Sequence, residues 1–229
     1  MLKARSSLVL AFALAAVVMT GSARASAVFT ETVITGDTSI LNPTATAAYN
    51  SLVVANNVGF AGAAVTVNGV DFGNDGSGFT NFSSTTANFS TDPFSPALNA
   101  LLDPLLFVSN AAPGALALSG LEVGRNYVLQ LLFSNDLNVT GNNVDITIEG
   151  TTHRLDGWQP DAINLTAEFT ASSSTVLVTF SGPADGQEGS ARRAIINAYA
   201  LHLLPEPGAM AIFALGLAGL AFARRRRAA

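Results

Sequence analysis

The sequence predicts an all-β protein, an antiparallel β-sandwich or jelly roll with one or two short helices, between two hydrophobic ends. Two observations carry this prediction. Residues 28–203 are rich in Thr, Ser, Asn, Gly and β-branched residues and contain no lysine, a composition that disfavours long helices and suits strands joined by turns. Apolar residues also alternate over many short segments separated by turn residues, the pattern of strands in packed sheets.

The first 27 residues have the pattern of a secretory signal peptide. Lys3 and Arg5 precede an apolar run over 8–19, and small residues follow. Cleavage after Ala25 or after Ala27 fits the small-x-small pattern of signal peptidase sites. We therefore expect export. An uncleaved N-terminal membrane anchor is the disfavoured alternative, because the apolar run is short for a membrane span.

Short strands are expected throughout the domain 28–203, and the clearest covers 126–134. In that segment Tyr127, Leu129, Leu131 and Phe133 alternate with Val128, Gln130 and Leu132. Both faces are thus largely apolar, as in a central strand of a sandwich. The other expected strands are 28–34, 64–72 with a hairpin turn at Asn68 and Gly69, 105–108, 115–118, 144–149, 163–169, 175–180 and 194–203.

Two short helices are expected in the first half of the domain. Ser95 and Pro96, ahead of the apolar segment 97–102, supply an N-cap and a proline at the first helical position. The loosely helical spacing of Ala, Tyr and Leu over 44–55, with Thr44 as N-cap, predicts the second helix.

The domain is acidic and contains no cysteine. It has four arginines and fifteen Asp and Glu residues, a net charge of −11. Such a surface repels nucleic-acid phosphates, so we expect no nucleic-acid partner. The lack of cysteine excludes thiol catalysis and cysteine-bound metals. A domain of this length buries enough surface to fold without disulfides.

Residues 204–229 form a separate segment with three consecutive parts. The first is a turn in which two prolines fix backbone angles and remove donors; its residues are Pro205, Glu206 and Pro207. An uncharged stretch follows over 208–223, and the last part is a basic cluster of Arg224, Arg225, Arg226 and Arg227. As a helix, the uncharged stretch is about 24 Å long at ~1.5 Å per residue, so it spans a membrane only if the arginines reach the cytoplasmic surface. A buried helix of a soluble domain is disfavoured, since the stretch lacks a polar face.

This tail resembles the PEP-CTERM sorting signal of Gram-negative bacteria, through the order of its three parts. The resemblance implies that an exosortase, a membrane protease or transpeptidase, recognises and cleaves the tail, much as an apolar lipid-anchor signal is removed. It also implies an inner-membrane intermediate held by the C-terminal helix. The final place would be the cell surface or the extracellular matrix, in association with exopolysaccharide.

Two stretches of the domain resemble galactose-binding-like jelly rolls. One is 120–135, a glycine turn followed by a tyrosine and the long central strand, and the other is 196–204, the last strand. The resemblance implies a jelly roll and carbohydrate binding. A fold alone does not determine a function, so the binding residues need separate support.

Trp158, the only tryptophan, is the strongest candidate for a ligand-binding residue. Asp156 and Asp161 flank it, in a segment that Gly157 and Pro160 mark as a loop. An aromatic ring with polar neighbours suits stacking against a sugar. The alternative, which has equal weight, is a tryptophan side chain buried beneath the loop.

Asp136, Asn138 and Thr140 are the best candidates for metal ligands. These side chains alternate before Gly141, like the first half of an EF-hand loop, and would hold a structural calcium ion. Thr147 stands where the loop would need its glutamate. An Asn/Gly-rich hairpin loop is therefore the favoured interpretation, and no other cofactor is expected.

Catalytic motifs are lacking, including His-Glu-x-x-His, Gly-x-Ser-x-Gly and a P-loop with its lysine. The two histidines fit a surface position for His153 and a hydrogen bond to a loop for His202 better than metal binding. We therefore expect a non-enzymatic structural or adhesive protein that binds exopolysaccharide. One alternative is a polysaccharide hydrolase, which needs two carboxylates about 5–10 Å apart across a cleft. The other is a structural matrix subunit without a ligand.

Overall fold

The computed structural model describes residues 26–44, 51–57, 64–74, 76–86, 94–108, 112–134, 143–156, 161–182 and 194–205. One α-helix and fifteen strands lie in these ranges. In chain order the elements are β1 (Val28–Val33), the 3-10 turn η1 (Asp37–Ser39), β2 (Ser51–Asn57), β3 (Val65–Val67), β4 (Val70–Phe72), β5 (Phe79–Thr80), β6 (Ser83–Thr86), α1 (Pro96–Leu102), β7 (Pro104–Phe107), β8 (Gly114–Ser119), β9 (Asn126–Phe133), β10 (Val144–Ile148), β11 (Thr151–Leu155), β12 (Ile163–Thr170), β13 (Thr175–Ser181), β14 (Ile195–Ile196) and β15 (Ala198–Leu203).

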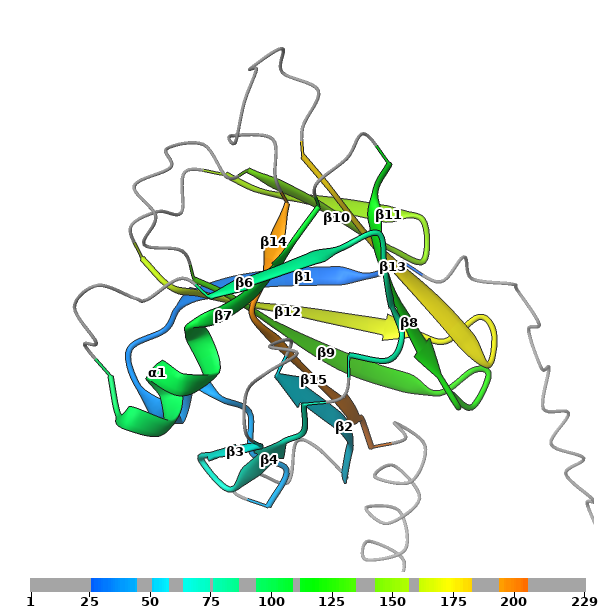
Figure 1. Cartoon of the computed structure of the whole chain (residues 1–229). Helices are drawn as coiled ribbons and strands as arrows, with labels where there is room; N and C mark the ends of the chain where they lie inside the picture. Colours follow the sequence, from blue (N-terminus) through cyan, green and yellow to red (C-terminus); the bar gives the residue numbers. More distant parts are fainter. Residues whose placement is uncertain are drawn as a thin grey trace, which may run out of the picture.

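Two five-stranded antiparallel sheets pack face to face (Figure 1). The first, which we call the β9 sheet, has the strand order β1-β12-β9-β15-β2. The second, the β13 sheet, has the order β11-β10-β13-β8-β5. This arrangement confirms the antiparallel β-sandwich with a short helix that the sequence predicts.

The main core lies between the two sheets. Leu129, Leu131 and Phe133 of β9 are fully buried in it. The β13 sheet supplies the facing side chains, among them Val144, Ile146, Ile148, Val176, Val178 and Phe180. Full burial of one such side chain stabilises a protein by about 1.5–3 kcal/mol. The alternation of apolar residues along these strands therefore provides much of the free energy that holds the sheets together.

A second core covers part of the outer face of the β9 sheet. Leu132, Ala198 and Ala200 belong to it, together with Leu98 of α1 and Phe72 of β4. Register explains why these residues share one face, because Ala198 lies opposite Leu132 and Ala200 lies two residues further along β15. The short alanine side chains leave room for α1 and the β3–β4 hairpin to pack against the strands.

The local signals for α1 and the β3–β4 hairpin are confirmed. The Ser95 hydroxyl accepts a hydrogen bond from the Leu98 N–H at 3.2 Å, and Pro96 is the first helical residue. At the hairpin turn Asn68 and Gly69 have φ values of 49° and 75°, the left-handed pair that a tight hairpin turn requires.

A third sheet, of order β14-β7-β6, extends the main core. Its buried side chains Leu106 and Ile195 lie in that core, and the buried Asn197 side chain joins the sheet to its surroundings. Asn197 Oδ1 accepts the Ser134 N–H at 2.6 Å, and Nδ2 donates to the carbonyl oxygens of Leu102 and Pro104 at 2.6 and 3.0 Å. One amide thus connects β9, α1, β7 and the start of β15.

Two expectations about secondary structure need correction. The helix expected over 44–55 is wrong for its second half, where β2 pairs with β15 along the edge of the β9 sheet; residues 45–50 lie outside the described ranges. Pairing with a distant strand decides the structure of such an ambiguous segment. The single strand expected over 194–203 is divided at Asn197 into β14 and β15, which belong to different sheets.

Candidate functional site

The strand directions define two ends of the sandwich, which can be followed in Figure 1. At one end of the sandwich, which we call the loop pole, β9, β11 and β13 end and β10 and β12 begin. The residues that adjoin these strand ends are Ser134, Asn143, Asp156, Asp161 and Gly182. The opposite end, the tail pole, contains Val28, Asn126, Gly150, Ser172 and Leu204. The two chain ends of the described domain therefore leave from the same pole.

The structure brings two predicted ligand residues to the loop pole. Asp156 follows β11, Asp161 precedes β12, and both side chains are exposed. Trp158 lies between them, outside the described residues. Its role in ligand binding and the alternative of a buried side chain both stay predictions.

The predicted calcium ligands belong to a connection that also starts and ends at the loop pole. Asp136, Asn138 and Thr140 lie outside the described residues, between Ser134 and Asn143. Among the residues that the structure describes, His, Asp and Glu side chains form no group of three that could hold a metal ion. A calcium site on this connection therefore stays a prediction.

An ion pair lies near the loop pole on the outer face of the β13 sheet. Arg154 donates from Nε to Asp145 Oδ1 at 2.8 Å and from Nη2 to Oδ2 at 3.0 Å. The two residues face each other across β10 and β11, so the guanidinium and the carboxylate meet in the two-bond geometry that favours this pair. Arg125 also lies beside an acid, 3.6 Å from Glu122 at the tail pole.

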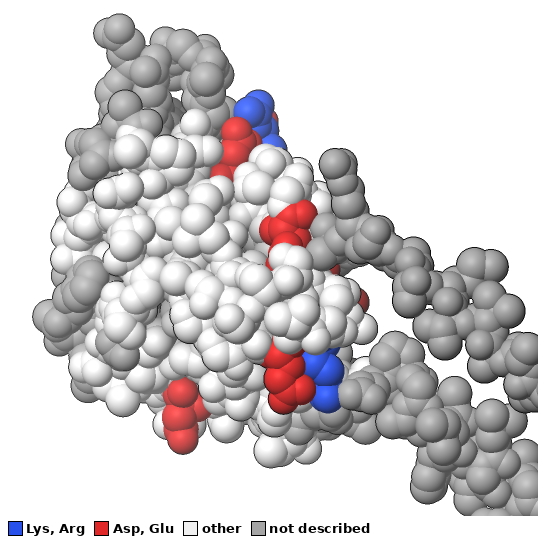
Figure 2. All heavy atoms as spheres, turned by 90° about the vertical axis from the view of Figure 1, so that its right-hand side faces the viewer, with Lys and Arg blue, Asp and Glu red and all other residues white. Residues whose placement is uncertain are grey.

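Charged side chains are sparse on the face shown in Figure 2, where most of the described surface is uncharged. Acidic groups are scattered over it, and the basic groups lie next to acidic ones. The two arginines that the structure describes are therefore balanced locally by acidic neighbours.

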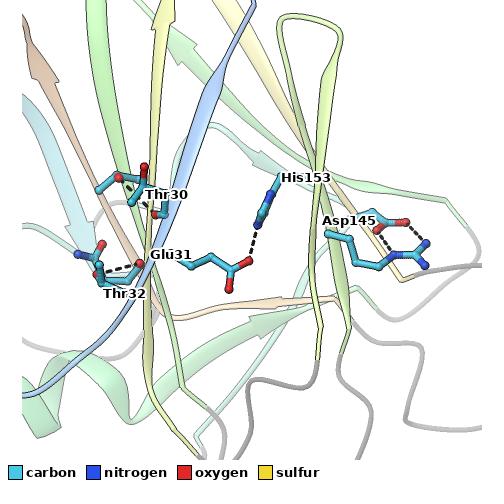
Figure 3. Close-up of polar contacts among 8 residues, drawn as sticks. Thr30, Glu31, Thr32, Asp145 and His153 are labelled. Carbon is cyan, nitrogen blue, oxygen red and sulfur yellow. Dashed lines mark hydrogen bonds and ion pairs between the residues drawn. The ribbon is translucent and has the colours of Figure 1, made fainter.

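His153 occupies a position that the sequence alone did not reveal. Its Nε2 lies 2.5 Å from Glu31 Oε1 (Figure 3). Its ring also stacks on Phe29, with centroids 5.0 Å apart and an angle of 18° between the planes. Glu31 and Phe29 come from β1, the edge of one sheet, and His153 from β11, the edge of the other. The three residues close the open side between the sheets.

His202 lies on β15 with its side chain buried on the outer face of the β9 sheet. It faces Val128 on one side and Leu52 on the other. Desolvation by burial lowers the pKa of His202 from its usual 6.5 to about 4. The ring is therefore neutral at pH 7, and its alternation away from Tyr199 and Leu201 is confirmed.

The fold and the C-terminal segment define the class of protein: a β-sandwich domain followed by a sorting signal. Residues 204–227 match the family described as PEP-CTERM protein-sorting motif, and the chain therefore carries this sorting motif at its C-terminal end. The motif marks an exported protein sorted to the cell surface, and it implies processing by an exosortase. Of its named residues Pro205 is described, whereas Glu206, Pro207 and the four arginines are not. No helix in the described ranges has the length and apolar character needed to cross a membrane.

Solved structures with a similar fold include plant ectodomains. The ANX1 ectodomain from Arabidopsis thaliana has a TM-score of 0.56 and 15% identity, and the match covers 67% of this chain and 42% of that one. The ANXUR2 extracellular domain from the same organism has a TM-score of 0.54 and 16% identity, with 67% and 41% covered. The chain thus spans less than half the length of these ectodomains, and the likeness concerns the fold alone. No curated protein matches the sequence.

Proposed function

We propose that this protein is a non-enzymatic structural or adhesive component of the cell surface or extracellular matrix, and that it binds exopolysaccharide through its loop pole. One observation carries the proposal: the sorting tail and the predicted ligand residues leave the sandwich at opposite ends. Leu204 lies at the tail pole, where its N–H donates to the Asn126 carbonyl at 2.9 Å, whereas Asp156 and Asp161 lie at the loop pole.

This polarity suits display from a surface. While the tail holds the chain in the inner membrane, the tail pole faces the lipid and the loop pole points away from it. After cleavage by the exosortase the same end remains the point of attachment. A ligand at the loop pole is then reached without interference from the membrane or from the processing enzyme.

The acidic surface favours an uncharged polysaccharide as the ligand over an anionic one. The domain has a net charge of −11, and the two arginines of the described ranges lie beside Glu122 and Asp145. A polyanion would meet repulsion over most of this surface. A neutral glycan would be held by hydrogen bonds and by stacking on an aromatic ring.

Sorting is tested by fractionation and intact-mass analysis of the wild-type protein and the Glu206→Ala variant in the native host. We expect the wild type to lose the segment after the motif and to leave the membrane, while the variant keeps its full C-terminus in the membrane fraction. An uncleaved tail in both proteins would contradict sorting and indicate a permanent membrane anchor.

Ligand binding is tested with neutral and anionic polysaccharides purified from the same host. We expect the wild type to retain neutral polysaccharide and the Trp158→Ala variant to lose most of that affinity, with Leu177→Ala, on the outer face of the β13 sheet, as the control. Equal binding by all three proteins would contradict a role for Trp158. Release of new reducing ends from the polysaccharide would contradict the non-enzymatic proposal and favour a hydrolase.

A further inference from the structure

The sorting motif begins directly at the end of the folded sheet. Leu203, the last residue of β15, pairs with Tyr127 of β9 and with Ser51 of β2. The next residue, Leu204, still donates its N–H to the Asn126 carbonyl at 2.9 Å. Pro205, the first residue of the Pro-Glu-Pro turn, follows at once. The domain and the motif are therefore joined without a linker.

This junction restricts how an enzyme reaches the motif. Three extended residues span at most about 10 Å, so the apolar stretch that starts at Gly208 holds the tail pole close to the membrane. An enzyme that binds the residues before the motif in an extended form must either pull them from the sheet or contact the folded domain beside them.

Removing the end of β15 from the sheet is unfavourable. The strand lies between β9 and β2 and bonds to both. Leu201 is 1% exposed and His202 is fully buried, so opening this segment would break backbone hydrogen bonds on two sides and expose a core leucine. Contact with the folded tail pole avoids this loss.

The tail pole also carries exposed apolar side chains. In the described ranges Val123 and Val28 are the most exposed of the large hydrophobic residues, at 65% and 63%, and Val53 is 43% exposed. Leu177 and Val33, at 54% and 47%, lie away from this pole. Val123 lies in the turn before β9, Val28 begins β1, and Val53 lies near the start of β2. Val28 and Val53 lie on the two opposite edges of the β9 sheet, so the three valines do not form one continuous patch. Val123 is the most exposed of them.

The turn that presents Val123 has a defined shape. The Glu122 N–H donates to the Tyr127 hydroxyl at 2.9 Å, and the Gly124 N–H donates to the Ala171 carbonyl at 2.8 Å. Gly124 has a φ of 84°, which suits glycine. Val123 is therefore held in the solvent by a preformed turn that adjoins Asn126, the partner of Leu204.

We propose that the tail pole, with the exposed Val123 turn next to the Asn126–Leu204 junction, is a docking surface for the membrane-embedded enzyme that processes the tail. The enzyme would recognise the folded domain and the motif together. This inference rests on the proposed sorting function. The processing enzyme is the expected partner because the motif starts one residue after the last hydrogen bond of the sheet.

The test follows conversion of full-length precursor to cleaved protein over time in the native host. Val123→Glu places a charge on the proposed surface, and Leu177→Glu is the matched control, because Leu177 is 54% exposed on the outer face of the β13 sheet. Thermal unfolding of both purified variants verifies that they are folded. A third variant combines Val123→Glu with a flexible Gly-Ser linker between Leu204 and Pro205.

We expect Val123→Glu to slow cleavage several-fold, Leu177→Glu to be cleaved at the wild-type rate, and the linker to restore cleavage of the Val123→Glu protein. Wild-type kinetics for a folded Val123→Glu protein would overturn the inference and show that the tail alone is recognised. Equal slowing by both glutamates would overturn it as well, because the effect would not belong to the tail pole. A wild type that is not cleaved at all, like Glu206→Ala, would refute the sorting function itself.

Discussion

Glu31 and His153 meet between the edge strands of the two sheets, with 2.5 Å from the carboxylate Oε1 to the imidazole Nε2. They are 122 residues apart in the sequence. Their side chains are 38% and 26% exposed, so water screens the contact only in part. Together with Phe29, which stacks on the His153 ring, this pair covers the side of the core that neither sheet closes.

The coupling between these residues is measurable. Because the pair is partly exposed, we expect a double-mutant cycle of Glu31→Ala and His153→Ala to give a coupling free energy of about 0.5–1 kcal/mol in urea unfolding at neutral pH. Thr30→Ala, at the adjacent position of β1 on the opposite face, is the control and should show no coupling to His153. A coupling free energy of zero in this cycle would mean that the contact contributes nothing to stability.

Because His202 is buried in its neutral form, we expect the protein to lose stability in mild acid. Its pKa is lowered to about 4 in the folded protein, so between pH 6.5 and 4 the unfolded chain binds the proton more tightly. The contribution of the neutral His202 ring to the free energy of unfolding is therefore fully present above pH 6.5, and it declines as the pH falls towards 4. The shift corresponds to a maximum of about 3 kcal/mol.

The measurement is the free energy of unfolding as a function of pH for the wild type and for His202→Gln. Carboxylates titrate in both proteins, so only the difference between the two curves reports His202. We expect that difference to change between pH 6.5 and 4 and to stay constant above. A constant difference over the whole range would contradict a buried, neutral histidine.

We expect the side-chain amide of Asn197 to make a large contribution to the free energy of unfolding. Its side chain satisfies the Ser134 N–H and the carbonyls of Leu102 and Pro104 in a buried position. Each buried polar group left without a partner costs about 1–3 kcal/mol. We expect Asn197→Ala to lower the free energy of unfolding by about 2–4 kcal/mol, as measured in urea, and Asn197→Asp to be at least as harmful because it buries a charge. A loss of less than about 1 kcal/mol for both variants would contradict this role.

The contacts of Ala27 in the folded domain indicate which of the two signal peptidase sites is used. It is 5% exposed, belongs to the main core, and donates its N–H to the Thr151 hydroxyl at 3.3 Å. Cleavage after Ala25 keeps these contacts, whereas cleavage after Ala27 removes the residue. We expect N-terminal sequencing of the exported protein to begin at Ser26. A protein that begins at Val28 would contradict this expectation, and we expect that form to be less stable by about 1 kcal/mol.

Local signals in the sequence predicted local structure well. The Asn68 and Gly69 turn and the Ser95 cap depend on residues within a few positions of each other, and both are confirmed. The alternation in β9 also identified its central position. By contrast, β2 was expected as part of a helix, because its strand character depends on pairing with β15, which is distant in the sequence.

The candidate site was less predictable for the same reason. The sequence singled out the segment around Trp158 and the segment around Asp136 separately. Only the strand order places the described residues that flank both segments at one pole. The contact of His153 with Glu31 was missed, since no short-range pattern indicates which two sheet edges lie together. Three exposed valines at the tail pole are likewise scattered in sequence and adjoin one end of the sheet only through the fold.

The position of Leu204 at the end of β15 has a mechanical consequence. Suppose that a matrix polymer pulls on the loop pole while the C-terminal end is held at the cell. The load then runs along β15, at right angles to its hydrogen bonds with β9 and β2. These bonds are strained in shear, all at the same time, instead of opening one after another from an end. An interior strand with a partner on each side is well suited to carrying tension along its length.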